Sequence, residues 1–565
     1  MVIKIKKLRF NFNYAKMKKM AEGVCAVAMN EKYSLERAKC PEEVGVSSAQ
    51  VVEFLRDMKE NKLEFHSFMV IRNGKVACEL YRAPFNKEIP HSVYSVSKTV
   101  TAIAAGFAIE EGLFSLDTRI VDVFPEYVSA RTDGRIFSVT VRHLLTMTAG
   151  IAPNLLQNKG KIDWLAEYFK APFYGEPGTF RYVNENIFLL SAIICKKAKT
   201  TLREYLTPRL FAPLGIDVPY WETNRDGIEA GGWGLFLKLE DFAKLSYCLL
   251  NKGKIGKTQV IPEKWVEEMT QAHADTSICK NLDTDKGYGY CVWQNGGNSS
   301  YRMNGMFSQF GIAFEEQNAL IVCFGAIAGE QEARDCIWRH FPKAFIEPDK
   351  KAKEPLYEGF YSIAEEFKID NPNTSVRSLH EARLNEKTIE IKRKILLNLI
   401  GFPVSVIPFT VTFLNGKRAG NIDNINFTFK EHECLMSWCE GTEKNTVVCG
   451  MDGHLRYGDI VLAGVKYKVC CCAEWDEDVL SVNIRPLETA SKRKLKFTFV
   501  GTQKVIMKPL STPKVKEMAV NLVGAASEVI DNALVVAVMK KATKYVPWVL
   551  EPRHKGKLVG RKDIY

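Results

Sequence analysis

The chain has 565 residues, of which 46% are hydrophobic and 11% aromatic, so it is long enough for two or more domains with large cores. Its formal charge of +12 is concentrated at the ends: residues 1–19 carry seven Lys/Arg and no acid, and residues 536–565 carry eight against two. The near-neutral remainder argues against a nucleic-acid-binding face, so we expect no nucleic-acid partner.

The fifteen cysteines are odd in number and scattered, and three of them are consecutive at 470–472. This usage is typical of a reducing compartment. The apolar stretch at residues 23–29 is at the short limit for a signal peptide, and Glu22 precedes it. We therefore expect a cytoplasmic protein with no integral membrane segment.

The first elements after the basic N-terminal residues have clear local signals. Residues 47–60 place apolar side chains at helical spacing behind a serine, which predicts a capped helix. Asn73-Gly74 separates two apolar runs and predicts a β-hairpin. The alanine-rich segment 95–112 predicts a buried helix that begins at or next to Ser95.

Glycine- and proline-punctuated helices and loops follow from about 115 to 275, and strand patterns return after them. The predicted strands lie in 288–295, 310–317 and 319–328, with a helix at 332–341. The simplest fold is α+β: one antiparallel sheet built from both ends of residues 40–345, flanked by helices, with a mostly helical insertion between them.

The rest of the chain divides by composition. Residues 346–357 are charged and contain proline, as linkers do, and residues 358–510 alternate in short β-like runs such as 404–414, which predicts a C-terminal all-β domain. The expected domains are a basic extension (1–39), a main domain (40–345), a linker (346–357), a β-rich domain (358–510), and a helix with a basic tail (511–565), the helix lying near 513–541.

The pattern Ser-x-x-Lys occurs four times, beginning at Ser95, Ser277, Ser491 and Ser511. Only Ser95 opens a long apolar helix, where residues i and i+3 share a face, so the Lys98 amine can reach the Ser95 hydroxyl. Free backbone N–H groups at a helix start favour a developing oxyanion. Apolar neighbours of Lys98 can lower the pKa of its amine, so that it acts as a base for a nucleophilic serine.

Six segments in order resemble the serine β-lactamase-like superfamily, in particular the class C β-lactamase, D-aminopeptidase and S-x-x-K esterase group. They are YSVSKTVTA, LFSLDTRIVDVFPEY, VTVRHLLTMTAGI, GEPGTFRYVNENIFLLSAII, LTPRLFAPLGI and GGWGLFLKLEDFAKL. The resemblance covers roughly residues 40–345 and implies a β-lactamase/transpeptidase-like fold there. In that family the Y-x-N element, Tyr182 and Asn184 here, shares proton transfer with the lysine and orients the lysine and the substrate.

The family's third element is a strand with Lys-Thr-Gly or His-x-Gly, and the matching residues here are YRMNGMFSQF. Met303 stands where the family has a cation, with Arg302 beside it. The resemblance implies that Gly305 lets the backbone approach substrate, that the Met306 N–H completes an oxyanion hole with the Ser95 N–H, and that Gln309 belongs to the substrate site. We therefore expect short neutral esters to be preferred over substrates that carry a carboxylate.

Two other readings of single residues carry less weight. His143 could form a triad with Ser95, but the chain has no G-x-S-x-G elbow, and a structural histidine is favoured. Cys434, Cys439 and Cys449, with His432 or His454, lack the C-x-x-C spacing of zinc sites, so we expect no metal and no cofactor.

The sequence thus predicts a serine hydrolase that cleaves an ester or amide bond of a small molecule through a Ser95 acyl-enzyme, with Lys98 and Tyr182 as general base and acid. One alternative is a β-lactamase or D-stereospecific peptidase. Another is a penicillin- or muropeptide-binding sensor that is acylated without turnover. The oligomeric state stays open.

Overall fold

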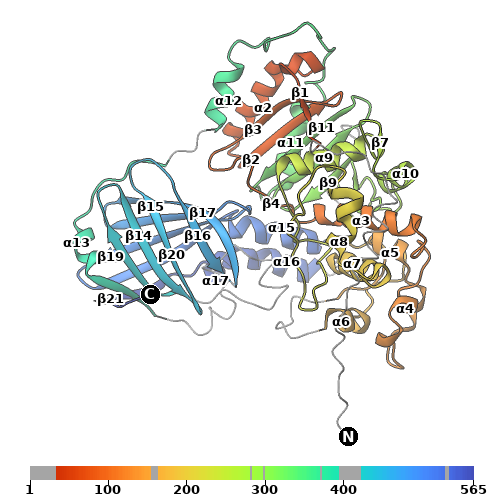
Figure 1. The fold of residues 1–565 in the computed structure, drawn as a ribbon. Helices are drawn as coiled ribbons and strands as arrows, with labels where there is room; N and C mark the ends of the chain where they lie inside the picture. Colours follow the sequence, from red (N-terminus) through yellow and green to blue (C-terminus); the bar gives the residue numbers. More distant parts are fainter. Residues whose placement is uncertain are drawn as a thin grey trace, which may run out of the picture.

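The computed structural model describes residues 33–153, 163–279, 283–296, 300–368, 372–392, 422–462, 464–527 and 533–564. These residues form two large sheets that lie side by side (Figure 1). The first sheet has an apolar core on each face, and the second sheet has one apolar core. The first sheet has seven strands, and the second has ten.

The seven-stranded sheet has the order β1-β3-β2-β11-β10-β9-β8. All neighbouring strands are antiparallel except β1 and β3. The strands are β1 (Glu36–Arg37), β2 (Phe65–Arg72), β3 (Lys75–Tyr81), β8 (Trp293–Gln294), β9 (Tyr301–Gly305), β10 (Gln309–Phe314) and β11 (Ala319–Gly325). Both ends of the predicted main domain thus supply this sheet, as expected.

Helices cover both faces of this sheet, so its strands are apolar on both sides. On one face, Phe310 and Ile312 join the core beneath α2 (Ser48–Glu60), α11 (Glu330–His340) and α12 (Phe360–Lys368). On the other face, Gly311 lies against α9 (Leu239–Leu250), beyond which α3 (Val96–Glu110) is buried. Because α12 follows the predicted linker in the chain, the core beneath α2 and α11 includes residues from beyond that linker.

The local predictions at the start of the sheet are confirmed. Ser47 caps α2 by accepting a hydrogen bond from the Gln50 N–H. Asn73 and Gly74 connect β2 to β3 with φ angles of 51° and 81°, the left-handed values of a tight hairpin turn. Ser95 is the N-cap residue of α3.

The region between the two halves of the sheet is mostly helical, as predicted, and α3 packs against α7 within it. Besides α3 and α9, its α-helices are α4 (Ile120–Val123), α5 (Val141–Leu145), α6 (Trp164–Lys170), α7 (Asn184–Ala198), α8 (Leu202–Leu206) and α10 (Glu263–Thr270). Two short strands, β4 (His91–Ser92) and β5 (Phe236–Leu237), pair beside the start of α3.

The ten-stranded sheet has the order β15-β14-β13-β12-β21-β20-β19-β18-β17-β16, and it closes on itself because Gly450 of β15 also pairs with Cys472 of β17. Its strands are β12 (Lys387–Ile391), β13 (Ile422–Phe429), β14 (Glu433–Glu440), β15 (Glu443–Gly450), β16 (Arg456–Leu462), β17 (Val465–Asp476), β18 (Val479–Pro486), β19 (Lys492–Val500), β20 (Lys504–Thr512) and β21 (His554–Gly560). Its apolar core also holds a buried ion pair between Arg493 and Glu440.

The prediction of a β-rich C-terminal domain is confirmed by this sheet, and the structure adds helices that the sequence did not predict. The short helix α13 (His380–Asn385) precedes β12, and the helix near 513–541 is divided into α15 (Val515–Ser527) and α16 (Ala533–Ala542). The expected basic tail supplies β21, which lies between β12 and β20. The predicted β-like run 404–414 is outside the described residues.

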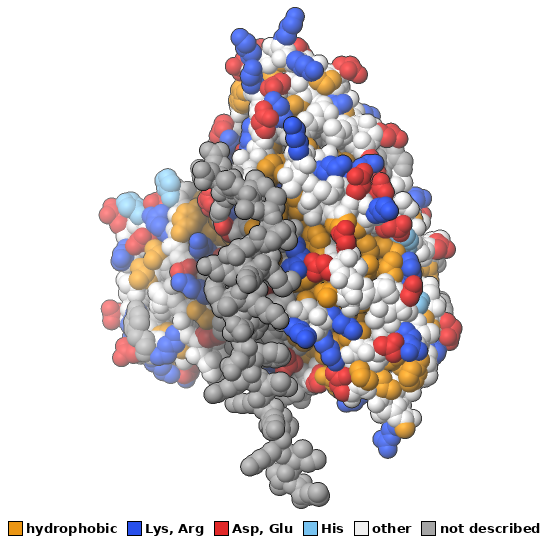
Figure 2. Space-filling model, turned by 45° about the vertical axis from the view of Figure 1, so that its right-hand side comes forward, with side chains coloured by type: hydrophobic (Ala, Val, Ile, Leu, Met, Phe, Trp, Pro, Cys, Tyr) orange, Lys and Arg blue, Asp and Glu red, His pale blue; other side chains and the backbone are white. Residues whose placement is uncertain are grey.

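No helix in the described ranges is long and apolar enough to cross a membrane. The uncharged run 395–414 lies outside those ranges, so the expectation of no membrane segment stays a prediction. On the face shown in Figure 2, Lys/Arg and Asp/Glu side chains are interspersed over the described surface.

Candidate active site

The Ser95 hydroxyl and the Lys98 amine lie in direct contact at the start of α3. The Lys98 Nζ donates hydrogen bonds to the Ser95 Oγ at 2.7 Å and to the Gly232 carbonyl at 2.7 Å. The Lys98 side chain is only 1% exposed, and burial lowers the pKa of its amine to about 7. A substantial fraction of the amine is therefore neutral near pH 7 and able to accept the serine proton.

Tyr182 contacts both Ser95 and Lys98. The Lys98 Nζ lies over the Tyr182 ring, 4.9 Å from its centroid, and the tyrosine hydroxyl is hydrogen-bonded to Ser95. Burial raises the pKa of the Tyr182 hydroxyl above its ordinary value, although the Ser95 hydrogen bond lowers it. The hydroxyl therefore stays protonated at neutral pH and can donate a proton.

Aromatic rings continue the site from Tyr182 toward the edge of the sheet. Trp293 of β8 stacks on Tyr182 with centroids 5.7 Å apart and planes at 20°, and Tyr288 meets Tyr182 edge-on at 6.1 Å. Such rings give a rigid apolar wall, because each has few rotamers and a large contact area.

Two glycines bring the Gly232 carbonyl to the lysine, a role that the sequence interpretation did not assign. A Cβ on Gly232 would lie 2.7 Å from the Asn184 carbonyl oxygen, and one on Gly231 would lie 2.6 Å from the Ile187 carbonyl oxygen. Gly231 also has a φ of 64°, which other residues rarely adopt. The Gly-Gly-Trp-Gly run was the available signal, because such close backbone approach requires glycine.

Asn184 lies beside Gly232, but its side chain differs in one contact from what the resemblance implied. It is the first residue of α7, and it is exposed. Among the described residues, no hydrogen bond joins its side chain to Lys98, and the Lys98 amine donates to the Gly232 carbonyl. The buried asparagine of this turn is Asn186, whose Oδ1 accepts a hydrogen bond from the Tyr168 hydroxyl at 2.8 Å.

Gly305 and Met306 lie at the end of β9, next to the nucleophile segment. A Cβ on Gly305 would lie 2.3 Å from the Val93 carbonyl oxygen, so only glycine allows β9 to approach the residues just before Ser95. Met306 follows with a side chain 40% exposed. The structure thus brings the end of β9 next to the residues before α3, and the roles implied for Gly305 and Met306 toward a substrate stay predictions.

Gln309 lies in this turn, but it is fully buried and directed into the protein. Its Nε2 donates to the carbonyls of Met306, Phe307 and Gly325 at 2.9–3.1 Å, and its Oε1 accepts from the Gly325 N–H. This side chain fixes the β9–β10 turn and does not face a substrate. The expectation that it contacts substrate is therefore corrected to a structural role.

Arg302 and Met303 also differ from the expectation. Arg302 is fully buried beside Trp293, and its guanidinium donates to Asn304, Asn295 and the Asp283 carbonyl. Burial, with Arg334 nearby, lowers the pKa of Arg302 to about 9. These contacts hold the Arg302 guanidinium in the protein interior.

Met303 points to the opposite side of the strand. Its sulfur accepts a hydrogen bond from the Ser246 Oγ of α9 at 3.9 Å, and its methyl lies close to Gly311. The position that carries a cation in the family is therefore part of the core under α9, and it supplies no anchor for a carboxylate.

The remaining candidates have structural contacts. The His143 Nδ1 lies 3.1 Å from the Thr140 N–H and 3.0 Å from the Thr140 Oγ1, which caps α5, and burial lowers its pKa. Among the described residues, no group of three or more His, Cys, Asp or Glu is placed to hold a metal ion. The fourteen cysteines of the described ranges are free thiols.

The β-lactamase family model matches residues 56–341, which is half of the chain. This chain therefore belongs to the β-lactamase family. It is 24% identical over 243 residues to a 6-aminohexanoate-dimer hydrolase of Paenarthrobacter ureafaciens, covering 39% of this chain and 60% of that protein. It is 26% identical over 239 residues to a lovastatin esterase of Penicillium rubens, covering 32% and 58%.

Among solved structures, a penicillin-binding protein from Bacillus halodurans matches with a TM-score of 0.40 and 19% identity, over 51% of this chain and all of that one. The chain spans no more than about 60% of the length of the two curated relatives named above.

Proposed function

We propose that this protein is a serine hydrolase that cleaves an ester or amide bond of a small molecule through an acyl-enzyme on Ser95. The observation that carries the proposal is the buried Lys98 amine, 2.7 Å from the Ser95 Oγ, with its pKa lowered to about 7. A surface lysine would keep its ordinary pKa and would stay protonated, so it could not accept the serine proton.

In the proposed reaction, neutral Lys98 accepts the proton as the Ser95 oxygen attacks the carbonyl carbon. The Tyr182 hydroxyl, hydrogen-bonded to Ser95, passes a proton toward the leaving group and is reprotonated from Lys98. The N–H groups of Ser95 and Met306 are the proposed donors to the oxyanion. Water, activated by the same pair, then releases the acid product and restores the Ser95 hydroxyl.

We further propose that short neutral esters are preferred over substrates with a carboxylate beside the scissile bond. Met303 faces α9, and Arg302 is held by three partners, so neither provides the cation that such a carboxylate needs. The loss of a hydrogen bond to a charged group costs roughly 1.5–3 kcal/mol, about one to two orders of magnitude in kcat/KM. The lovastatin esterase among the relatives supports an ester as the bond that is cleaved.

The test compares kcat/KM for p-nitrophenyl butyrate and nitrocefin in the wild type and in Ser95→Ala. We expect faster ester turnover in the wild type and none in Ser95→Ala. Ser277→Ala is the matched control, because Ser277 also begins a Ser-x-x-Lys pattern but lies exposed in a loop. Efficient nitrocefin turnover would instead indicate a β-lactamase, and a Ser95 adduct that persists for hours would indicate a non-turnover sensor.

A further inference from the structure

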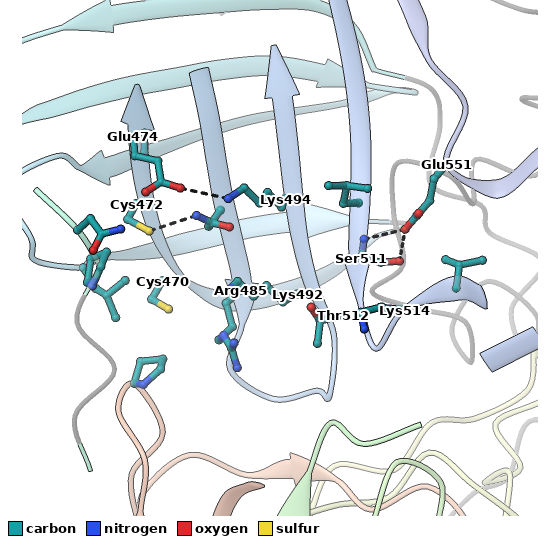
Figure 3. Close-up of a pocket in the computed structure, with 18 of the residues that line it drawn as sticks. Cys470, Cys472, Glu474, Arg485, Lys492, Lys494, Ser511, Thr512, Lys514 and Glu551 are labelled. Atoms are coloured by element: carbon teal, nitrogen blue, oxygen red, sulfur yellow. Dashed lines mark hydrogen bonds and ion pairs between the residues drawn. The ribbon is translucent and has the colours of Figure 1, made fainter. Parts of the chain in front are cut away.

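The helix α16 is part of a longer helical run that lies against α15 beside the ten-stranded sheet (Figure 1). It is followed by a 3₁₀ turn, Thr543–Tyr545, and by α17 (Val546–Leu550), so the backbone stays helical from 533 to 550. Just after this run, Glu551 accepts hydrogen bonds from the Ser511 N–H at 2.7 Å and the Ser511 Oγ at 2.6 Å (Figure 3). These bonds tie the end of the helical run to β20.

The side of this run that faces solvent, which we call the outer face, is apolar. Val538, Tyr545 and Trp548 are 60%, 56% and 76% exposed. Their positions differ by seven and then three residues, so they lie on one face of a helix. Thr543, by contrast, is buried, because the opposite side of the run packs against α15. A solvated helix face normally carries polar side chains, so the apolar outer face indicates a further binding partner.

Lysines accompany these apolar side chains. Lys540, Lys541 and Lys544 are exposed, and the helical run contains no Asp or Glu. The Lys544 Nζ lies over the Tyr545 ring, 4.8 Å from its centroid. Lys541 lies three residues after Val538 and four before Tyr545, and therefore on the outer face itself. The outer face is thus both apolar and positively charged.

Nearby carboxylates have other partners. Glu517 of α15 pairs with Lys514 at 2.8 Å, and Glu551 is held by Ser511. Asp531, the nearest acid before the run in the sequence, lies outside the described residues. Among the described residues, no carboxylate forms an ion pair with any of the three lysines, so the outer face keeps its positive charge.

This composition favours one kind of partner. Tyrosine and tryptophan are enriched where a protein meets lipid headgroups, and the stems of lysine side chains let their ammonium groups reach the phosphates. A second copy of the same face would bring the lysines of both chains together, and their like charges disfavour that contact. An anionic membrane surface accommodates the apolar and the charged groups at once.

We infer that the outer face docks on the surface of a membrane that contains anionic lipids. Its apolar side chains enter the boundary between headgroups and acyl chains, and the three lysines contact the lipid phosphates. The helical run lies along the membrane, because its other side is packed against α15. The inference is independent of the proposed hydrolase activity, because it uses none of the residues of that site.

The test is flotation of the full-length protein with vesicles of phosphatidylcholine and phosphatidylserine, mixed in a ratio of roughly two to one. Vesicles of phosphatidylcholine alone are the control for charge. We expect at least tenfold tighter binding to the anionic vesicles, and added NaCl should weaken it because salt screens the lysines. Tryptophan emission should shift to the blue on binding, and Trp548→Phe should remove that shift.

A first pair of variants tests the apolar part of the face. Val538→Ser/Trp548→Ser should weaken binding to the anionic vesicles at least tenfold, because it removes apolar area from the membrane contact. The matched control is Tyr457→Ser/Val500→Ser, which changes two exposed apolar residues of the ten-stranded sheet and should bind like the wild type.

A second pair tests the charge. Replacement of the three lysines of the outer face by glutamine should also weaken binding at least tenfold. Its matched control replaces three exposed lysines of the predicted linker by glutamine: Lys350, Lys351 and Lys353. This control and Ser95→Ala should bind like the wild type, and melting temperatures establish that every variant is folded.

Three results would overturn the inference. The first is binding to anionic vesicles that is no tighter than binding to phosphatidylcholine alone. The second is equal binding by the face variants and their controls, which would place any membrane contact elsewhere in the chain. The third is a dimer without vesicles that Trp548→Ser dissociates, which would assign the outer face to a second copy.

Discussion

At the level of single residues, the protonation state of the Lys98 amine determines whether Ser95 can be acylated in the proposed reaction. Burial lowers the pKa of its amine to about 7, and only the neutral amine accepts a proton. We predict that kcat/KM for p-nitrophenyl butyrate falls about tenfold per pH unit below about 7 and levels off above it. A pH–rate profile from 5 to 9 checks this prediction.

Lys98→Ala should lose several orders of magnitude in kcat/KM, because a nucleophile and its base act as a unit. Lys98→Arg is the charge-retaining control, and it should be equally inactive, since arginine stays protonated. A flat profile in the wild type, or near-wild-type activity in Lys98→Ala, would make Lys98 a structural lysine.

The contact that orients Lys98 gives a second prediction at this scale. Gly232→Ala forces a Cβ to within 2.7 Å of the Asn184 carbonyl oxygen, so the Gly232 carbonyl has to move away from the amine. We predict a loss of about 10- to 100-fold in kcat/KM, since small misplacements of a catalytic group have effects of that size.

Asn184→Ala is the comparison for that variant, because Asn184 is exposed at the start of α7. It should stay within about threefold of the wild type in the same ester assay. The reverse order, with Asn184→Ala inactive and Gly232→Ala active, would restore the orienting role that the family resemblance gave to Asn184.

At the scale of elements, the two faces of β9 determine what a substitution at Met303 does. Met303 packs under α9 beside Ser246, so a lysine there would be buried without a carboxylate partner. We predict that Met303→Lys lowers the free energy of unfolding by about 3 kcal/mol or more and does not improve nitrocefin turnover.

Met303→Leu is the control of similar volume and should cost less than about 1.5 kcal/mol. Urea unfolding and nitrocefin kcat/KM of both variants make the comparison. A stable Met303→Lys protein with selectively faster nitrocefin turnover would show that this position does face the substrate.

Elements whose signals are local were predictable from the sequence. The Asn73-Gly74 hairpin, the Ser47 cap and the helix after Ser95 each follow from a few neighbouring residues. The strand β21 was overlooked, although His554, Gly556 and Leu558 alternate with exposed lysines in the period-2 pattern of a half-buried strand. The charge of the basic tail obscured that alternation.

The residues of the candidate site also divide into those whose positions follow from local sequence and those whose positions depend on the tertiary fold. Ser95 and Lys98 are three positions apart on one helix, so their contact could be predicted from spacing alone. The roles of Asn184, Gln309 and Arg302 depend on which way a side chain leaves a helix end or a twisted strand, and on backbone groups from other segments. Gly232 acts through its carbonyl, which no side-chain motif reveals.

At the scale of the whole molecule, the closed sheet touches the segment that leads to the nucleophile. The Ser92 N–H donates to the Glu488 carbonyl at 2.7 Å, and the Tyr94 hydroxyl is hydrogen-bonded to the backbone of Ala490. Arg485 pairs with Glu64 at 2.6 Å. The connection between β18 and β19 therefore lies against the residues just before Ser95.

The titratable groups of this contact predict that it weakens in acid. Burial lowers the pKa of His66 to about 4 and that of His91 to about 3. Burial alone would raise the pKa of Glu64, but Arg485 and His66 outweigh it and lower that pKa. Unfolding lets the two histidines bind protons at higher pH, so their contribution is lost as pH falls from about 6.5 toward 3 to 4. The contribution of Glu64 is lost only as pH falls below about 4.5, its ordinary pKa.

We therefore predict that the free energy of unfolding drops by on the order of 2–3 kcal/mol per histidine between pH 7 and 4. His66→Gln/His91→Gln should flatten this dependence, and His432→Gln, at an exposed site, should not. Urea unfolding at a series of pH values makes the measurement. Identical pH dependence in the double variant and the wild type would contradict the account.

Acylation of Ser95 with Lys98 as its base can be tested by intact-mass analysis of the protein after a rapid acid quench. Wild-type protein mixed with p-nitrophenyl butyrate should carry one butyryl group, and peptide mapping should place it on Ser95. Ser95→Ala should carry none, and Lys98→Ala should acquire it far more slowly. An adduct on another residue, or turnover without Ser95, would contradict the account.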